Sequence, residues 1–225
     1  MKKSLCAFLP LVAILAGCGT ANSYLADRTS TVEMYHIFDI KTTASTAVMA
    51  KAAVDGLSRN TNSVDSKTPL QIGATVPAEP GRFALVDMGA KLAGTGLGDM
   101  LQMASLQGGS ISMKSAVCES AVWTAKAVRH VTNSNNLTLY ACLYKYTQGY
   151  HLDTYAVFRK TEGGIVQVSR DIAFKLVGTP EEWVNKTIWD MVRAMEAAGN
   201  AKMTRLEGQP ELGSEPAIAQ NAVLK

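Results

Sequence analysis

The sequence predicts one domain of the α+β class, in which an antiparallel meander of about four to five strands packs against an N-proximal helix and a long C-terminal helix. Alternating apolar residues separated by turn signals recur between residues 112 and 176, which is typical of hairpin-connected strands. An alanine-rich stretch at helical spacing precedes them, and a capped amphipathic stretch follows them. Helices kept apart from a run of strands indicate an α+β architecture.

The first elements are predicted between residues 32 and 81. Val32–Ile40 alternates apolar and polar residues as a half-buried strand does. Thr43–Arg59 has apolar residues at helical spacing, and the hydroxyls of residues 42–43 can cap its start. Residues 60–81 are polar and contain three prolines, and one alternating run there predicts a short edge strand: Leu70, Ile72, Ala74 and Val76.

The middle of the chain has one ambiguous segment and four predicted strands. Residues 83–88 are a strand or the start of the next helix, and residues 89–109 are rich in glycine, leucine and methionine. There Ala90, Gly94 and Gly98 recur every four positions, which favours a core helix, a glycine-rich loop or a segment for partner binding or self-association. The four strands are predicted over residues 112–129, 137–146, 150–159 and 165–176, with turns at 133–136 and 163–164.

The C-terminal helix has the clearest sequence signals. Thr179, Pro180 and Glu182 form a capping box with proline in the first turn, and Gly199-Asn200 supplies a stop. The order strand, helix, meander, helix resembles helix-grip domains of outer-membrane lipoproteins, a resemblance that concerns the fold alone. We therefore expect the domain to span residues 32–207, with a disordered tail over residues 208–225.

The N-terminus indicates export. Lys2 and Lys3 precede an apolar run over residues 6–16, which is too short to cross a hydrocarbon core of about 30 Å. The run ends in Leu15-Ala16-Gly17-Cys18, which resembles the lipobox of bacterial lipoproteins. This resemblance implies that residues 1–17 are removed as a signal peptide and that Cys18 carries acyl chains that hold the protein on a membrane. The alternative is an ordinary signal peptide with an incidental cysteine.

The residues after Cys18 indicate where the protein is held. By the same resemblance, Gly19 in place of aspartate implies the outer membrane, with the domain facing the periplasm, as in enteric-type bacteria. Residues 18–31 are small and polar and read as the lipidated cysteine and a flexible tether that spans roughly 20 Å.

Two cysteines, Cys118 and Cys142, remain in the predicted domain. In an oxidising compartment they predict one disulfide bond, and two buried free thiols are the alternative. A tight hairpin at residues 133–136 would place Cys118 opposite His151, so a bridge to Cys142 requires a longer loop or contact between elements that are not neighbours.

Composition and motifs indicate neither a catalytic centre nor a nucleic-acid partner. Without Lys2 and Lys3, 20 of the 22 basic residues remain against 19 acidic residues, so the net charge is close to zero. The sequence has no block of basic residues. We assign no catalytic residue, cofactor or metal ion; the one pair considered for a metal, His151 and Asp153, shares a strand face and is more typical of a sheet surface. Tyr140, Tyr144 and Tyr146 also share a face, which indicates cross-strand packing or a stacking platform for a glycan or peptide.

These observations predict a membrane-anchored lipoprotein that acts as a non-enzymatic binding or scaffolding module of the cell envelope, with an envelope protein as its partner. The alternative is an enzyme or ligand carrier that acts on cell-wall or lipid material. The alternative requires a cavity lined by convergent polar groups, whereas the first hypothesis requires a surface for a partner.

Overall fold

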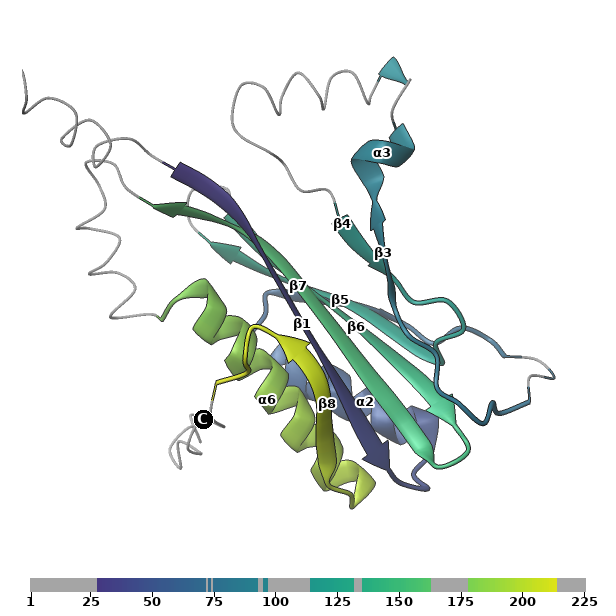
Figure 1. Cartoon of the computed structure of the whole chain (residues 1–225). Coiled ribbons are helices and arrows are strands. Elements are labelled where there is room, and N and C mark those ends of the chain that lie inside the picture. The colour runs from purple at the N-terminus through teal and green to yellow at the C-terminus, as the bar shows by residue number, and fades with distance from the viewer. Residues whose placement is uncertain are drawn as a thin grey trace, which may run out of the picture.

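The computed structural model describes residues 28–71, 73, 75–92, 95–96, 114–131, 135–162 and 178–213, and their arrangement is shown in Figure 1. These residues form a six-stranded antiparallel sheet with the strand order β2-β5-β6-β7-β1-β8, and a separate antiparallel pair. The strands of the sheet are β1 (Arg28–Lys41), β2 (Ser63–Lys67), β5 (Trp123–Val131), β6 (Asn135–Tyr146), β7 (Gly149–Glu162) and β8 (Met203–Gln209). The α+β class is confirmed, and the sheet has six strands in place of the four to five predicted.

The meander at the centre of the sheet follows the prediction. β5, β6 and β7 are joined by hairpins, in a register that places Trp123 opposite Leu143 and Leu143 opposite Leu152. The predicted strands 137–146 and 150–159 correspond to β6 and β7, and the predicted strand 32–40 corresponds to β1, although all three are longer. The predicted strand 165–176 lies outside the described residues.

The single strand predicted over residues 112–129 is wrong. The structure has two strands there, β4 (Lys114–Val117) and β5, which belong to different sheets. The chain turns between them, because Ser120 adopts a left-handed conformation with φ 61°. Ala121 and Val122 are both buried although they are adjacent, which interrupts the strand alternation at this turn.

The edge strand predicted at residues 70–76 is also wrong, because the described residues of that stretch are not in a strand. The edges of the sheet are β2 and β8, and four of the five β2 residues are exposed. An edge strand is held mainly by backbone hydrogen bonds and need not bury side chains, so neither strand carries an alternating apolar pattern.

Two helices cover one face of the sheet: α2 (Thr46–Ser58) and α6 (Pro180–Gly199). The predicted helix 43–59 therefore begins later than expected, and its N-cap is Ser45, whose side chain accepts a hydrogen bond from the Val48 amide. The predicted capping box of α6 is present between Thr179 and Glu182. A short helix, α3 (Met88–Leu92), continues directly from β3 (Ala84–Asp87), so the segment 83–88 is a strand that leads into a helix.

The hydrophobic core lies between the helices and the sheet. A Cβ atom built on Gly56 would stand 2.4 Å from Met191 Cα, so the backbones of α2 and α6 approach closely at this glycine. The inward face of the sheet supplies the other half of the core with large buried side chains, among them Phe38, Trp123, Leu139, Leu143 and Leu152. Leu212 is also buried against this core, so ordered structure continues past residue 207, where we expected the domain to end.

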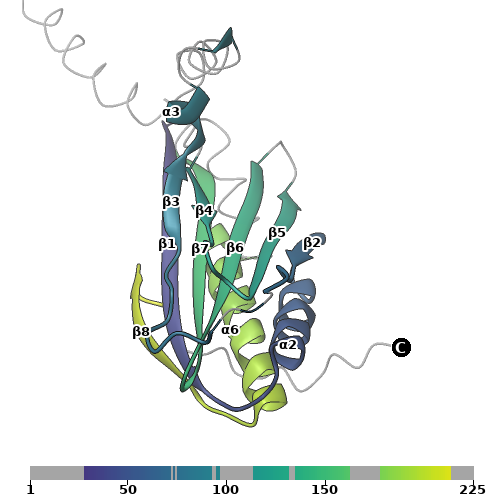
Figure 2. The same ribbon diagram turned by 90° about the vertical axis from the view of Figure 1, so that its right-hand side faces the viewer.

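The opposite face of the sheet is covered by the connection between β2 and β5. We call its described residues, 68–71, 73, 75–92, 95–96 and 114–122, the strap; they include the β3–β4 pair. Figure 2 shows the strap on one side of the sheet and both long helices on the other. The sheet thus separates an apolar core on one side from a second, smaller contact layer on the other.

Candidate functional site

The predicted disulfide bond is confirmed, and it joins the strap to the sheet. Cys118 and Cys142 are bonded, with 5.6 Å between their Cα atoms. Cys142 lies in β6 opposite Thr124, whereas Cys118 lies in the turn that precedes β5. The bridge therefore connects elements that are not paired strands. This is one of the two arrangements that the sequence left open, the other being a longer loop between two paired strands. Cys18, the predicted lipidation site, lies outside the described residues.

Aromatic rings fill the layer beneath the strap. Phe83 of the strap lies between Tyr35 and Tyr155, with ring centroids 6.3 and 6.0 Å away, and Tyr140 stacks on Tyr155 at 6.2 Å. Tyr144 is 1% exposed, because the strap lies on its ring. The tyrosines share one face as predicted, and this contact with the strap is cross-strand and interlayer packing, not an open stacking platform.

A buried carboxylate holds the strap at Phe83. Asp153 of β7 is 1% exposed, and its Oδ2 atom accepts a hydrogen bond of 3.0 Å from the Phe83 backbone amide. Burial raises the pKa of Asp153 to about 6, against a smaller opposing effect of this hydrogen bond. Its Oδ1 atom has no hydrogen-bond partner among the residues that the structure describes. Asp153 is thus a buried carboxyl group beneath the strap that holds its proton more tightly than an exposed aspartate does.

A groove of about 620 Å³ opens between the strap and β6. Tyr144 forms part of its floor, and Val76, Pro77, Pro80 and Val122 contribute apolar surface to its walls. The Tyr144 hydroxyl is buried and has no hydrogen-bond partner in the described part of the chain, and burial raises its pKa. The groove therefore has a lining of mixed polar and apolar residues with a tyrosine ring in its floor, a combination that suits a ligand.

Hydrogen bonds fix the strap wall of the groove in place. The Thr147 amide, in the β6–β7 turn, donates to the Pro77 carbonyl over 3.0 Å. On the other side, the Gln71 side chain donates to the carbonyls of Ser120 and Ala121 over 3.4 and 3.5 Å. The groove is consequently formed by three parts of the chain that are far apart in sequence: residues 70–71 with 75–81, residues 120 and 122, and residues 144–145.

A polar cluster lies beside the groove, at the end of β1. The Tyr146 hydroxyl donates to Asp39 Oδ1 over 2.6 Å, and Lys41 Nζ lies 3.1 Å from Asp39 Oδ2 and donates to the Tyr146 oxygen. The pKa of Tyr146 is raised by burial and by its bond to Asp39, and the pKa of Lys41 is raised chiefly by its bond to Tyr146. The phenol stays protonated and the amine stays charged at neutral pH, so the cluster joins two strand ends and contains no activated base.

The two residues considered for a metal ion have separate partners. His151 and Asp153 do share the strapped face of β7. However, His151 Nε2 lies 3.5 Å from Asp39 Oδ1, whereas Asp153 binds the Phe83 amide. Among the described residues, no group of three or more histidine, cysteine, aspartate or glutamate side chains could hold a metal ion.

Comparison with known proteins gives no family. No protein-family model matches the chain, and no curated protein matches it. The described helices include none that is long and apolar enough to cross a membrane.

Several residues of this site carry no signal in the sequence. Phe83 and Asp39 stand in ordinary strand patterns, and only the structure shows what they contact. The usable signals were the shared face of the tyrosines and the cysteine pair, whose predicted disulfide required residue 118 to lie against residue 142. The small-residue segment 89–109 falls mostly outside the described residues, which contain only α3 and residues 95–96 of it.

Proposed function

We propose that this protein is a lipid-anchored binding module of the cell envelope, which binds an envelope protein in the groove between the strap and β6. The groove of about 620 Å³, with Tyr144 in its floor, is the observation that carries the proposal. The lipobox-like Leu15-Ala16-Gly17-Cys18 supports an acyl anchor at the outer membrane, facing the periplasm. The Cys118–Cys142 bond agrees with an oxidising compartment.

The position of the groove supports this orientation. β1 begins at Arg28, ten residues after Cys18, so the proposed anchor is tied to that end of the sheet. Tyr144 of the groove lies opposite His151, and His151 lies opposite Asp39 of β1. Asp39 is eleven residues after Arg28 along β1. At about 3.3 Å per strand residue, the groove lies roughly 36 Å from the anchored end. An anchor at Cys18 thus presents the groove away from the membrane.

The lining of the groove favours a peptide segment as ligand. Leu70 and Val76 expose 85% and 45% of their surface beside it, and exposed apolar side chains of this size typify contact surfaces. Glu79 and Lys145 add one charge of each sign at the rim. An extended segment with apolar side chains between polar ones would match this lining.

The fold supports the proposal only as an analogy. A helix-grip-like arrangement requires helices packed against one face of an antiparallel sheet. We propose that this protein has a helix-grip-like topology. A shared fold carries no function, so the groove and the anchor have to be tested directly.

Two experiments test the anchor and the groove separately. Mass spectrometry of the protein from its host membrane should find acyl chains on Cys18 and no residues before it. For the groove, a photo-crosslinking amino acid in place of Lys145 should capture one discrete partner in intact cells. The matched control replaces Lys51, which is exposed on α2 at the helix-covered side of the sheet. Equal capture from both positions would contradict the groove as the binding site.

A ligand carrier for lipid or cell-wall material is the second candidate, favoured by the unpartnered Tyr144 hydroxyl and Asp153 carboxylate oxygen on the strapped face. A carrier should retain a small molecule through purification. Native mass spectrometry of the intact protein would then show an added mass that Tyr144→Phe reduces. Only the apoprotein mass, together with crosslinking from Lys145, would favour the protein-binding function.

A further inference from the structure

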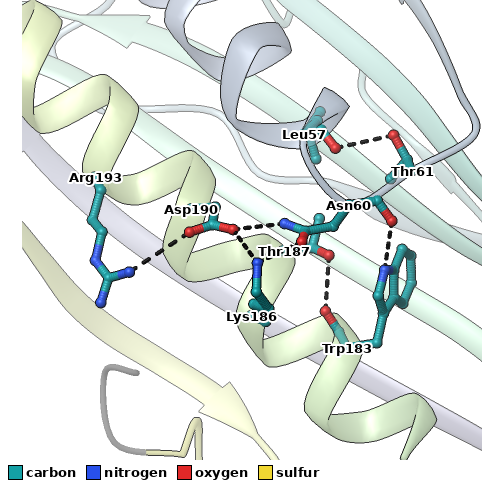
Figure 3. Close-up of polar contacts among 8 residues, drawn as sticks. All are labelled: Leu57, Asn60, Thr61, Trp183, Lys186, Thr187, Asp190 and Arg193. Carbon is teal, nitrogen blue, oxygen red and sulfur yellow. Dashed lines mark hydrogen bonds and ion pairs between the residues drawn. The ribbon is translucent and has the colours of Figure 1, made fainter. Parts of the chain in front are cut away.

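A loop between α2 and β2 is held against α6 by the polar network drawn in Figure 3. Asn60 donates from Nδ2 to Asp190 Oδ2 over 2.7 Å and accepts at its carbonyl a 2.7 Å bond from Trp183 Nε1. Lys186 Nζ donates to Asn60 Oδ1 over 2.6 Å and to Asp190 Oδ2 over 2.8 Å. These bonds fix the loop and the first turns of α6 relative to each other.

A cavity of about 510 Å³ lies beside this network, on the opposite side of the sheet from the groove. Three different elements each bring one cation to its lining: Arg59 from the end of α2, Arg129 from β5 and Lys186 from α6. The guanidinium of Arg129 lies 5.6 Å from the ring centroid of Trp183, which is 6% exposed. Stacking on an indole ring orients a guanidinium while leaving its N–H groups free to bind.

Positive charge exceeds negative charge at this cavity. Glu182 is the one acidic residue in its lining, and its Oε2 atom accepts a 2.8 Å bond from the Thr179 amide in the capping box. Asp190 lies behind the lining and binds Lys186 and Asn60. These two bonds lower the pKa of Asp190, and the nearby Arg59 lowers it by a smaller amount. Neither Arg59 nor Arg129 forms an ion pair of 4 Å or less with another described residue. Two arginines without an ion-paired carboxylate among the described residues therefore line the same cavity.

We propose that this cavity binds a phosphate group. Arginine forks match the oxygen atoms of phosphate in paired, charge-assisted hydrogen bonds, and a nearby lysine adds a point charge. Arg129 and Arg59 would hold the phosphate oxygens, with Lys186 at the wall. The capped amides at the start of α6 are already bonded and take no part.

The place of the cavity in the fold suggests where the phosphate comes from. The register across the sheet gives its level: Arg129 of β5 lies opposite Leu137 of β6. The residue after Leu137 is Thr138, which lies opposite Val157 of β7, and Val157 lies opposite Glu33 of β1. This level is five residues from Arg28, or roughly 17 Å along the strand. The cavity is thus near the end that carries the proposed anchor, where a phospholipid headgroup and free phosphate are both available. The phosphate site itself does not depend on the anchor; only the headgroup as its source does.

The test uses the full chain, labelled with 5-fluorotryptophan and held in a nonionic detergent. Three fluorine signals arise from Trp123, Trp183 and Trp189, and Trp183→Phe assigns the one of interest. Inorganic phosphate is titrated in one arm, and short-chain phosphatidylglycerol in the other. Both arms are repeated with Arg59→Gln/Arg129→Gln, and with the control Lys51→Gln/Lys91→Gln, which removes the same charge from exposed positions.

The proposal expects a saturable shift of the Trp183 signal alone. The affinity should be at least about tenfold weaker in the double arginine variant, because two charge-assisted contacts are lost, and unchanged in the control. Arg129→Lys, which keeps the charge but loses the planar fork, should weaken binding without unfolding the protein. Tighter binding in the lipid arm identifies the headgroup as the source, and tighter binding in the phosphate arm identifies a soluble ligand. No saturable shift in either arm, or the same affinity in the arginine variant, would overturn the proposal whether or not Cys18 is acylated.

Discussion

Asp153 and His36 are buried titratable side chains whose pKa values burial moves in opposite senses. Burial raises the pKa of Asp153 to about 6 and lowers that of His36 to about 4. The stability that Asp153 contributes is complete below its unfolded pKa and is lost as the pH rises through 6. The stability that His36 contributes is complete above its unfolded pKa and is lost as the pH falls through 4. The two effects oppose each other between pH 4 and 6.

Single substitutions should therefore expose opposite slopes of stability with pH. With Asp153→Asn the His36 effect remains alone, so the free energy of unfolding should fall as the pH falls from 7 to 5, by up to about 2 kcal/mol. With His36→Phe it should rise over the same range. Urea unfolding at several pH values measures both, and the wild-type protein, with a flatter profile, is the control. Parallel profiles for the two variants would contradict this account.

The strap is the element whose attachment can be changed without altering the sheet. The Cys118–Cys142 bridge closes a loop of 25 residues, and in the chain-entropy view its loss costs about 3 kcal/mol. Reduction should raise hydrogen exchange at the Phe83 amide, while amides in β6 and β7 stay protected. Cys118→Ser should behave like the reduced protein, and a reductant should change it no further. Equal exchange at Phe83 with and without reductant would show that Asp153 and the aromatic rings hold the strap unaided.

The contact between the two long helices depends on one missing side chain. A methyl group at Gly56 would meet the Met191 backbone, which cannot move aside without shifting α6. Gly56→Ala should therefore lower the free energy of unfolding by about 1–3 kcal/mol, although alanine is the better helix former. Ser58→Ala, exposed in the same helix, is the matched control. Chemical denaturation of both variants measures the difference, and equal stability would contradict the close approach.

The same elements show what the sequence could predict. α6 was predictable because its capping box and apolar stripe are local signals, and the meander because its strands bury one face. β2 and β8 were not, because edge strands need no alternating burial. The groove and the cavity could not be predicted either, because each combines segments that are far apart in the chain. Arg59 and Arg129 belong to no sequence motif that would indicate a shared site.

At the scale of the whole molecule, the two proposed sites lie at different distances from the anchored end of the sheet. Asn136 is exposed near the start of β6, and Lys145 is exposed near its end, nine residues away. At about 3.3 Å per residue, these positions differ by roughly 30 Å along the strand. If the acyl anchor holds the Arg28 end at the membrane, Asn136 should lie much nearer the lipid headgroups than Lys145.

Energy transfer to a headgroup-labelled lipid measures this difference in the protein reconstituted into vesicles. A donor dye at Asn136→Cys should be strongly quenched, and the same dye at Lys145→Cys only weakly, because transfer efficiency falls steeply over such a distance. A dye at Lys51→Cys, on α2 and close in chain position to the far end of β1, should resemble the Lys145 position. Similar quenching at Asn136 and Lys145 would mean that the domain lies along the membrane, and the groove would then face the lipid surface instead of a partner in the periplasm.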